Sequence, residues 1–426
     1  MTFDALTPAQ IQALHDEQST AYEALQNAGL VLDLTRGKPS LAQLDLSMGL
    51  LDLPGAGHYK DAAGTDLRNY GGLPGLPELR VIFADLLGVS VDQLVAGNNA
   101  SLQLMHDTLV YCLLHGTTDS ERPWGKEEKI KFLCPVPGYD RHFALCEELG
   151  IEMISVPTTE DGPDVEAVTR LVADDPQIKG IWVVPTYANP SGAVCSREVA
   201  AALTSMPTAA PDFRIFWDNA YAVHHLTEIE TKSADALSLA AAGQHPNRVF
   251  LFASTSKITF AGGGVSFFAS SAANVAWYLA HLAKASIGPD KLNQLRHAMF
   301  LKDAEGVRAL MAKHREIIAP KFEAVASILS ERLGGRGVAR WNEPKGGYFV
   351  SLEVVDGTAS RVVELAKAAG IALTPAGAAY PYGKDPADRH IRIAPTFPTP
   401  GDVALAIDGV ATCVLLAATE KSLAGV

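Results

Sequence analysis

The sequence predicts an α/β fold in which a mostly parallel sheet is flanked by helices and joined to a smaller α+β domain. Short, continuously apolar runs alternate with helical segments in the middle of the chain, as buried parallel strands and their connecting helices do. After about residue 300, long helical segments surround two short strand-like segments instead. At 426 residues, 48% hydrophobic and 19% charged, the chain is long enough for two domains and has an ordinary globular composition.

The expected elements follow one another in a regular order. The first helix has Pro8 in its first turn and Gly29 as a stop signal, and a loop follows at residues 35–39. Strands are expected at residues 130–134, 151–156, 178–184, 214–217, 249–253 and 265–269. Helices are expected at residues 7–28, 141–149, 163–172, 196–206, 304–333 and 360–369, and from 400 to about 418, with strand-like segments at 346–352 and 391–393.

Composition and charge disfavour nucleic-acid-binding, secreted and membrane-spanning proteins. The formal charge of −13, from 35 Lys and Arg against 48 Asp and Glu, disfavours a nucleic-acid partner. The five cysteines are odd in number and scattered, with no C-x-x-C pair, so we expect reduced thiols in a cytoplasmic protein. The first residues lack the basic and apolar regions of a signal peptide. The apolar stretch 403–419 contains Asp408 and is expected to be too short to span a bilayer.

Chemically useful side chains follow three of the expected strands. Lys257 comes just after the strand at 249–253 and is preceded by Ser254-Thr255-Ser256, while Asn189 and Asp218 lie at or after two other strand ends. Because parallel sheets bind ligands at the carboxyl ends of their strands, we expect these side chains to share a site. A lysine held there is desolvated, so its neutral amine is favoured and can attack a carbonyl group.

These segments together resemble the class I, pyridoxal phosphate-dependent aminotransferases of fold type I. The resemblance extends from Leu34 to Pro395, and its details look most like bacterial aspartate aminotransferases of the MocR-like subgroup. The motifs that carry it are Gly37-Lys38-Pro39, the segment 70–80 beginning Tyr70-Gly71-Gly72-Leu73-Pro74-Gly75, Gly97-Asn98-Asn99-Ala100-Ser101-Leu102, Pro137-Gly138-Tyr139, Asn189-Pro190-Ser191-Gly192, Asp218-Asn219-Ala220-Tyr221, Ser254-Thr255-Ser256-Lys257 and Arg392.

The resemblance implies an architecture and an assembly. It implies a mostly parallel, seven-stranded sheet in a large cofactor-binding domain at residues 50–300. Residues 1–49 and 301–426 would form a small domain built from both ends of the chain. It also implies a homodimer with shared active sites, in which Tyr70 reaches the cofactor phosphate of the other subunit.

The resemblance also implies roles around the cofactor ring. Lys257 would hold pyridoxal 5'-phosphate as an internal aldimine and then act as general acid and base in ping-pong transamination. Asp218 would keep the ring nitrogen protonated, so that the ring acts as an electron sink. Asn189 and Tyr221 would donate hydrogen bonds to the phenolate oxygen, and Tyr139 would stack on the ring.

The phosphate and the substrate would be bound by further segments. A helix start at Gly97, Asn98, Asn99, Ala100 and Ser101 would bind the phosphate, together with Ser254 and Ser256. The family's phosphate-binding arginine would fall near Val265, where this chain has no basic residue; Gly262-Gly263-Gly264 or an arginine from elsewhere would have to replace it. Arg392 would grip the substrate α-carboxylate through its planar fork, and Gly37 and Asn189 would also bind the substrate.

Each motif alone also fits a plainer role. Asp218 could cap a helix, Asn189-Pro190-Ser191-Gly192 could be a turn, residues 97–101 could be a simple helix cap, and Arg392 could lie on a solvated strand face. No H-E-x-x-H, Cys/His cluster, dinucleotide-binding glycine motif or G-x-S-x-G elbow favours a metal site or another enzyme class.

We therefore predict an aminotransferase, with aspartate and 2-oxoglutarate as the favoured pair. Alternatives on the same fold are aminotransferases for aromatic amino acids, kynurenine or aminoadipate, and a carbon–sulfur lyase. A transcription regulator would need a basic DNA-binding module, but only about 30 residues precede Leu34, and they are acidic overall. The residue that reads a distal substrate carboxylate stays open, with Lys291, Arg296, His297, Arg36, Lys38 and Arg141 as candidates.

Overall fold

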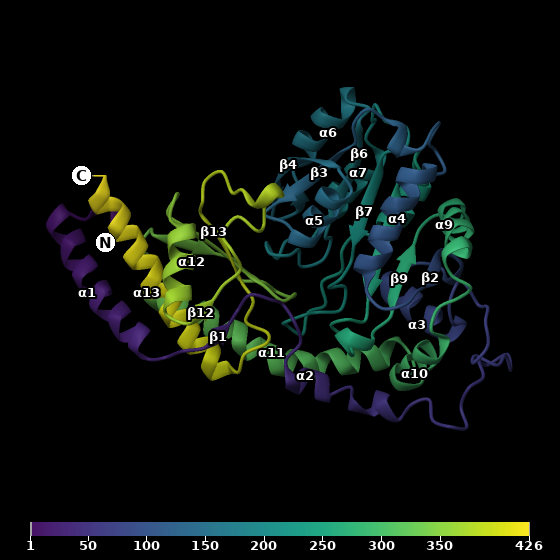
Figure 1. Ribbon diagram of the computed structural model, residues 1–426, viewed down its shortest axis with the longest axis horizontal. Coiled ribbons are helices and arrows are strands. Elements are labelled where there is room, and N and C mark those ends of the chain that lie inside the picture. Colours follow the sequence, from purple (N-terminus) through teal and green to yellow (C-terminus); the bar gives the residue numbers. More distant parts are fainter. Residues whose placement is uncertain (1, 426) are drawn as a thin grey trace.

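The computed structural model describes residues 2–425 and consists of two bodies connected by one long helix, α11 (Ala304–Leu333) (Figure 1). The first half of α11 contributes Val307 and Leu310 to the core beside the large sheet. Its second half contributes Val325 and Leu329 to the core of the smaller body. The helix therefore belongs to both hydrophobic cores, and the predicted division at residues 49/50 and 300/301 stays a prediction.

The elements follow the order expected for an α/β chain. The strands are β1 (Leu32–Asp33), β2 (Leu94–Ala96), β3 (Lys131–Val136), β4 (Glu152–Thr159), β5 (Gly162–Pro163), β6 (Ile178–Val183), β7 (Arg214–Asp218), β8 (Val249–Ser254), β9 (Ser266–Ala269), β10 (Ala339–Trp341), β11 (Val350–Val354), β12 (Ile371–Ala372) and β13 (His390–Ile393). The other α-helices are α1 (Pro8–Asn27), α2 (Leu41–Asp45), α3 (Pro77–Leu87), α4 (Ser101–His115), α5 (Asp140–Glu148), α6 (Val165–Asp174), α7 (Arg197–Ser205), α8 (Ala236–Ala242), α9 (Ala272–Ala285), α10 (Lys291–Leu301), α12 (Ala359–Ala368) and α13 (Pro400–Ala424). Short 3-10 helices lie at Phe3–Ala5, Met48–Asp52, Val91–Gln93, Trp124–Lys126, Ala261–Gly263 and Pro381–Gly383.

The large sheet of the described chain has the strand order β2-β9-β8-β7-β6-β3-β4-β5. Strands β4, β3, β6, β7 and β8 run parallel, whereas β9 pairs antiparallel with both β8 and β2. The mostly parallel sheet that was predicted is therefore confirmed. The two-residue strand β5, antiparallel to β4, adds an eighth strand to the seven that were expected.

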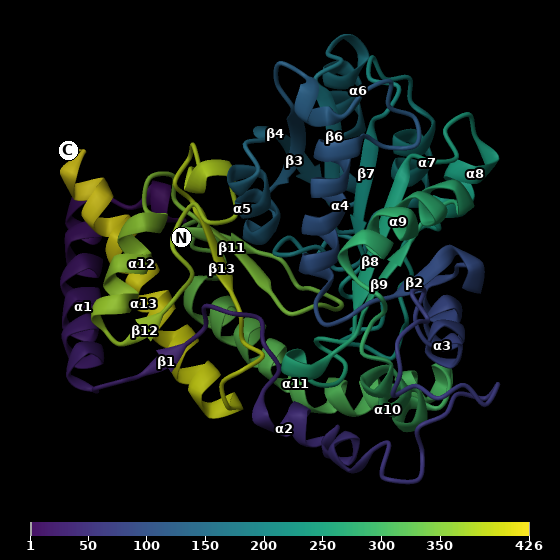
Figure 2. The same cartoon turned by 45° about the vertical axis from the view of Figure 1, so that its right-hand side comes forward.

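Alternating side chains of these strands pack on opposite faces of the large sheet. Phe216 and Phe250 belong to the core under α4, α5 and α9. Ile215 and Leu251, their neighbours in sequence, belong to the core under α3, α6, α7 and α8. Because both faces are covered, strands of continuous apolar sequence are stable there, as the sequence pattern indicated. Both layers of helices are visible on either side of the sheet in Figure 2.

The smaller body contains the antiparallel sheet β10-β11-β13 and the parallel pair β1–β12. Helix α13 packs against both α1 and α11, and the last helix of the chain thus lies beside the first (Figure 1). Leu34, which follows β1, is fully buried in the same core as α13. Elements from both ends of the chain thus pack together in this core.

Helix α13 corrects the expectation that its apolar stretch is too short to span a bilayer. The helix has 25 residues and a mean hydropathy of 1.8 over its most apolar window, so length and composition alone would allow a membrane span. However, 72% of that window is buried inside the protein, as in the core helix of a soluble protein. The other expected elements lie within about four residues of the observed ones, whereas α13 continues to Ala424.

Candidate active site

A small pocket lies at the carboxyl edge of the large sheet, where several of the predicted site residues meet. Its lining includes Lys257 after β8, Asp218 at the end of β7, Asn189 after β6 and Tyr139 after β3. Tyr221 also lines the pocket, together with Ser101 and Leu102 from the first turn of α4. Parallel strands end at one edge, and the segments that follow them therefore converge there.

Asp218 offers one carboxylate oxygen to this pocket without a partner. Its side chain is buried, and Oδ2 accepts a hydrogen bond from Nε2 of His142 at 3.0 Å. The other oxygen, Oδ1, is buried and has no hydrogen-bond partner within residues 2–425. An unpaired buried carboxylate oxygen is costly, so this arrangement fits a donor supplied by a bound group.

His142 lies between Asp218 and the indole ring of Trp182. Its imidazole is stacked on Trp182 with ring centroids 4.2 Å apart and an interplanar angle of 8°. It also makes an edge contact with Tyr139, at 4.9 Å between centroids. The imidazole is thus fixed in orientation by two aromatic rings, and it holds the Asp218 carboxylate in place.

Lys257 lies in the short turn after β8, and its amine nitrogen is 4.9 Å from the centroid of the Tyr221 ring. Burial lowers the pKa of Lys257, and the negative charge of Asp218 opposes that shift. Burial also raises the pKa of Tyr221 well above its ordinary value, so this phenol stays protonated and can donate a hydrogen bond. A lysine in this environment is more readily neutral than a solvated one.

The helix start at residues 97–101 is anchored to the loop that follows Lys257. Asn98 accepts hydrogen bonds at its backbone oxygen from the Ser266 N–H at 2.8 Å and the Ser266 hydroxyl at 2.6 Å. The Asn99 amide donates to the carbonyl of Ala261 at 3.1 Å, and Ala100 has φ +71° just before α4. Of these five residues, Ser101 lines the pocket, whereas Gly97, Asn98 and Asn99 hold the loop in position.

Where the family has its phosphate-binding arginine, this chain has Val265, which is part of the hydrophobic core. Val265 is fully buried, and its N–H donates to the Thr255 hydroxyl at 2.9 Å. Arg296 of α10 approaches the same glycine loop, because a Cβ built on Gly263 would lie 3.1 Å from its Nη2. Asn293 orients this guanidinium: its side-chain oxygen accepts from Arg296 Nε at 2.6 Å, while its amide donates to the Gly264 carbonyl at 3.0 Å.

The other residues that were predicted as candidates to bind a distal substrate carboxylate differ in burial and in their contacts. Lys291 is buried and donates to the backbone oxygen of Asn69 at 2.8 Å, beside the exposed Tyr70. His297 is fully buried, with Nε2 3.0 Å from the Thr259 hydroxyl. Lys38 lies 3.9 Å over the Phe397 ring, and Arg36 and Arg141 are exposed. In the described chain, Arg296 has no carboxylate within ion-pair distance.

Arg392 of β13 lies next to the pocket through its contact with Asn189. Its Nη1 donates to the Asp140 carboxylate at 2.8 Å and to the Asn189 side-chain oxygen at 3.4 Å. Its Nη2 donates to the Thr374 hydroxyl at 3.4 Å, and its buried Nε has no partner within residues 2–425. One side of the guanidinium fork is therefore held by Asp140, and the other retains free donor capacity.

Gly37 supports the same arginine through an aromatic ring. The Arg392 guanidinium carbon is 5.0 Å from the centroid of the Phe349 ring. A Cβ on Gly37 would lie only 2.4 Å from Cζ of that ring, so no larger residue fits there without moving Phe349. The predicted pair Gly37 and Arg392 is thus brought together, with Phe349 between them.

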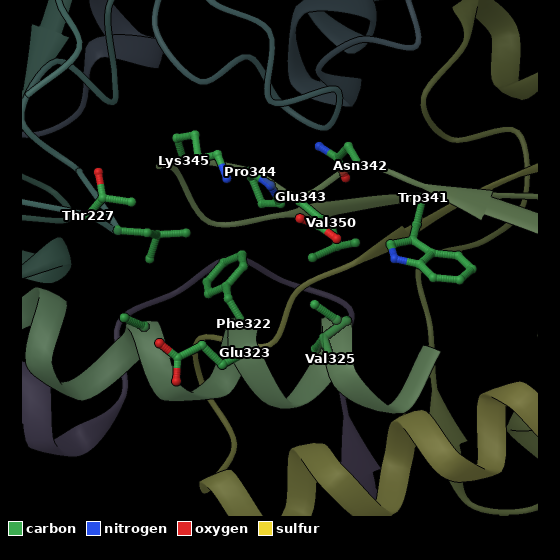
Figure 3. Close-up of a pocket in the computed structure, with 13 residues that line it drawn as sticks. Thr227, Phe322, Glu323, Val325, Trp341, Asn342, Glu343, Pro344, Lys345 and Val350 are labelled. Atoms are coloured by element: carbon green, nitrogen blue, oxygen red, sulfur yellow. The ribbon is translucent and has the colours of Figure 1, made fainter. Parts of the chain in front are cut away.

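A separate hollow lies between α11 and the segment from Trp341 to Lys345 (Figure 3). Phe322 and Val325 point from α11 towards this segment. This hollow shares no lining residue with the Lys257 pocket. Among the described residues that line it, no lysine and carboxylate lie together at the end of a parallel strand. The predicted site residues Lys257, Asp218 and Asn189 line the other pocket instead.

Comparison with known proteins places this chain in a family. Residues 6–425 match the family described as aspartate amino-transferase. The chain is 54% identical over 418 residues to the aspartate aminotransferase of Corynebacterium glutamicum, a match that covers 98% of this chain and 96% of that protein. This chain belongs to the aspartate amino-transferase family. An aspartate transaminase structure from Corynebacterium glutamicum superposes on this aminotransferase with a TM-score of 0.97 at 53% identity, over 99% of each chain. A Mycolicibacterium smegmatis protein provisionally named an aminotransferase is 62% identical over 425 residues, 99% of each chain.

The fold of this aminotransferase is the one that the motifs predicted, and the fold-type I resemblance is confirmed. Sequence reasoning missed His142 and Asp140, which contact two of the predicted site residues. Both follow the Pro137-Gly138-Tyr139 motif directly, in the first turn of α5. Polar residues in the first turn after a site motif are a signal that could have identified them.

Proposed function

We propose that this aminotransferase uses pyridoxal 5'-phosphate to transfer the amino group of aspartate to 2-oxoglutarate, in a ping-pong cycle centred on Lys257. The observation that carries the proposal is the unpaired, buried Oδ1 of Asp218 in the pocket that contains Lys257. An acceptor of this kind fits a protonated pyridine nitrogen. Bound pyridoxal phosphate supplies an electron sink for the carbanion that forms when a Cα–H bond breaks.

The residues of the pocket have complementary roles in this proposal. Asp218 accepts a hydrogen bond from the ring N–H at Oδ1, while His142 holds Oδ2. Asn189 and Tyr221 donate to the phenolate oxygen, and the ring of Tyr139 packs against the pyridine face. Lys257 would hold the cofactor through its amine, and the same amine would carry the proton that leaves the substrate Cα. The lowered pKa of Lys257 supports this role, because only the neutral amine can accept that proton.

The phosphate is proposed to lie at the first turn of α4. Unpaired N–H groups and the helix dipole favour an anion there, and Ser254 and Ser256 add hydroxyl donors. The two hydroxyls are 3.1 Å apart, which is compatible with both facing one group. Tyr70 is 82% exposed, so it is free to reach the phosphate of a second copy in a homodimer. Arg296, held against Gly263, is the candidate to add positive charge where the family has an arginine.

Substrate binding is proposed to depend on Arg392, whose free fork would bind the α-carboxylate above Gly37. Aspartate is favoured as donor because the Corynebacterium glutamicum relative is named an aspartate aminotransferase. The free guanidinium of Arg296 would suit a distal carboxylate equally well. We also infer a cytoplasmic enzyme, since all five cysteines are buried and unpaired, as they remain in a reducing compartment.

Borohydride reduction of the purified protein loaded with pyridoxal phosphate, followed by peptide mapping, tests the cofactor assignment. The pyridoxyl group should be found on Lys257, and a label on another lysine would overturn the assignment. A panel of amino donors with 2-oxoglutarate tests the substrate. Aspartate should give the highest kcat/KM; a preference for aromatic amino acids, kynurenine or aminoadipate would reject aspartate and keep the transamination proposal.

A further inference from the structure

The backbone carbonyl of Lys257 is bound by side chains from two distant parts of the chain. Nε2 of His224 lies 3.3 Å from this oxygen, and the hydroxyl of Tyr348 lies 3.4 Å from it. Both side chains are buried, with 2% and 1% of their surface exposed. Within the described residues no backbone N–H outside the regular elements bonds to this oxygen. Two side chains thus satisfy the carbonyl of the lysine at the centre of the site.

The direction of every bond in this network can be derived. The backbone N–H of Ser40 can only donate, and it bonds to Oε1 of Gln43 at 3.0 Å, which fixes the Gln43 amide nitrogen as a donor. That nitrogen lies 2.9 Å from the Tyr348 hydroxyl, so the hydroxyl oxygen accepts from Gln43. The proton of Tyr348 is then directed to the Lys257 carbonyl.

The two histidines of the network are fixed in the same way. The Lys257 carbonyl can only accept, so Nε2 of His224 carries a proton. Nδ1 of His314 lies 3.0 Å from the Gln43 amide nitrogen and therefore accepts from it. Burial lowers the pKa of His224 well below its ordinary value and that of His314 to about 4, so both imidazoles are neutral near pH 7. Each imidazole is thus a single neutral tautomer, and Nδ1 of His224 and Nε2 of His314 have no hydrogen-bond partner within residues 2–425.

We propose that His224 and Tyr348 are positioning residues for Lys257, and that Gln43, through its bond to Tyr348, connects this carbonyl to the N-terminal segment. They hold the backbone of Lys257 and so determine where its amine lies relative to Asp218. The proposal rests on the proposed function, since it assigns these residues to the lysine that would hold the cofactor. Tyr348 precedes β11 and His224 follows β7, so two separate parts of the chain meet at the Lys257 carbonyl oxygen, and Gln43 of α2 is joined to it through Tyr348.

The cost of burying the polar side chains of this network favours a positioning role over simple packing. Four buried polar side chains are costly unless each is paired, and an apolar core would satisfy packing alone. Here His224 and Tyr348 bond directly to the Lys257 carbonyl, and Gln43 bonds to it through Tyr348. That carbonyl lies in a turn and not in a helix or strand. The amine of Lys257 must be held within a fraction of an ångström for proton transfer.

The test compares variants of the full-length protein loaded with pyridoxal phosphate. Tyr348→Phe removes one donor to the carbonyl, and Gln43→Met removes the link without touching Lys257. His224→Leu removes the second donor, whereas His224→Gln retains an amide N–H at similar reach. Tyr22→Phe is the matched control, because the Tyr22 hydroxyl donates to the Leu365 carbonyl at 2.9 Å, far from the site.

Two readouts distinguish positioning from folding. The first is the pH midpoint of the visible absorbance of the cofactor attached to Lys257. A loosened lysine is better hydrated, so this midpoint should rise by about half a unit in Tyr348→Phe, Gln43→Met and His224→Leu. The second is kcat, which should fall about three- to tenfold, as for one lost neutral hydrogen bond, with KM little changed. His224→Gln should lie nearer to the wild type, and Tyr22→Phe should change thermal stability alone.

Each result has a defined meaning. A wild-type protein without a visible cofactor band at Lys257 would overturn the proposed function and this inference with it. A normal wild-type band together with unchanged midpoints and kcat in Tyr348→Phe and Gln43→Met would overturn the positioning role alone. The same conclusion would follow if Tyr22→Phe shifted both readouts as strongly.

Discussion

Replacing Asp140 with asparagine should lower the KM for the amino-acid donor about fivefold and leave kcat nearly unchanged. The Asp140 carboxylate is bonded to Nη1 of Arg392 at 2.8 Å, so an incoming α-carboxylate competes with it for the same guanidinium. Asparagine keeps the shape and a neutral acceptor but removes the competing charge. In the free variant Arg392 lacks its ion pair with a charged residue 140. The substrate carboxylate therefore no longer has to displace that pair, and its binding free energy becomes more favourable by the energy of the pair.

The magnitude follows from the geometry of the pair. Two unit charges about 4 Å apart interact by about 4 kcal/mol at an effective dielectric constant of 20. Solvent reaches 35% of the Asp140 side chain, and screening reduces such partly exposed pairs to about 1 kcal/mol. Because 1.4 kcal/mol corresponds to tenfold, about 1 kcal/mol corresponds to roughly fivefold in KM.

The chain offers a closely matched control. Asp119 binds Nη2 of the buried Arg214 at 2.6 Å, and its side chain is also 35% exposed, but the pair lies away from the pocket. Asp119→Asn should therefore reduce the free energy of unfolding and leave KM unchanged. Initial rates with varied aspartate, at low and at raised ionic strength, measure the effect, and the gain in Asp140→Asn should shrink as salt increases.

Two outcomes would contradict this reasoning. A KM that rises in Asp140→Asn would show that Asp140 orients Arg392 for the substrate and does not compete with it. An unchanged KM, alongside the expected loss of stability in Asp119→Asn, would show that Arg392 is not the group that binds the α-carboxylate.

Three further predictions concern the same chain. Asp218→Asn should still bind cofactor but lose about 10²–10³ in kcat, because a neutral amide cannot keep the ring nitrogen protonated; near-normal turnover would make Asp218 a structural cap. Arg392→Lys should reduce kcat/KM by roughly 2–5 kcal/mol, with the visible band of the substrate-free enzyme unchanged; lost cofactor binding would mean that the wrong arginine was assigned. Burial lowers the pKa of His297, His314 and His390 to about 4, so the unfolded chain binds more protons than the folded one between pH 6.5 and 4. The free energy of unfolding should therefore fall as pH drops through that window, by at most about 3 kcal/mol per histidine, and denaturant titrations of His390→Gln should show a shallower fall.

Much of the fold and pocket could be predicted because local patterns determine them. Apolar runs between helices predict parallel strands, and their carboxyl ends place Asn189, Asp218 and Lys257 at one edge whatever the details of packing. Strand β9 shows the limit of this reasoning. Its apolar sequence resembles that of the parallel strands of the sheet. However, only 11 residues separate it from β8, which is too few for a helical crossover, and β9 therefore runs antiparallel to β8.

The contacts that tune the site could not be predicted, because they join residues distant in sequence. Asp140 and Arg392 are 252 positions apart, and Gln43 and Tyr348 are 305 apart. No periodicity of the chain relates such pairs, since each depends on how the smaller body packs against the large sheet. Arg296 illustrates the same point: the guanidinium that approaches the glycine loop after Lys257 comes from a helix that the sequence reading did not expect.

The pairing of the two ends of the chain has a consequence for its synthesis. Leu32 of β1 pairs with Ile371 of β12, and α1 packs along α13, the last helix of the chain. At about 5–20 residues per second, the ribosome needs roughly 20 to 70 s to make the chain between those strands. Throughout that time β1 lacks its paired strand and α1 lacks α13, whereas the large sheet can already form. Nascent chains stopped before residue 400 would therefore carry a folded sheet and a tethered, unpaired N-terminal helix, and holdase chaperones should capture them more readily than the finished protein.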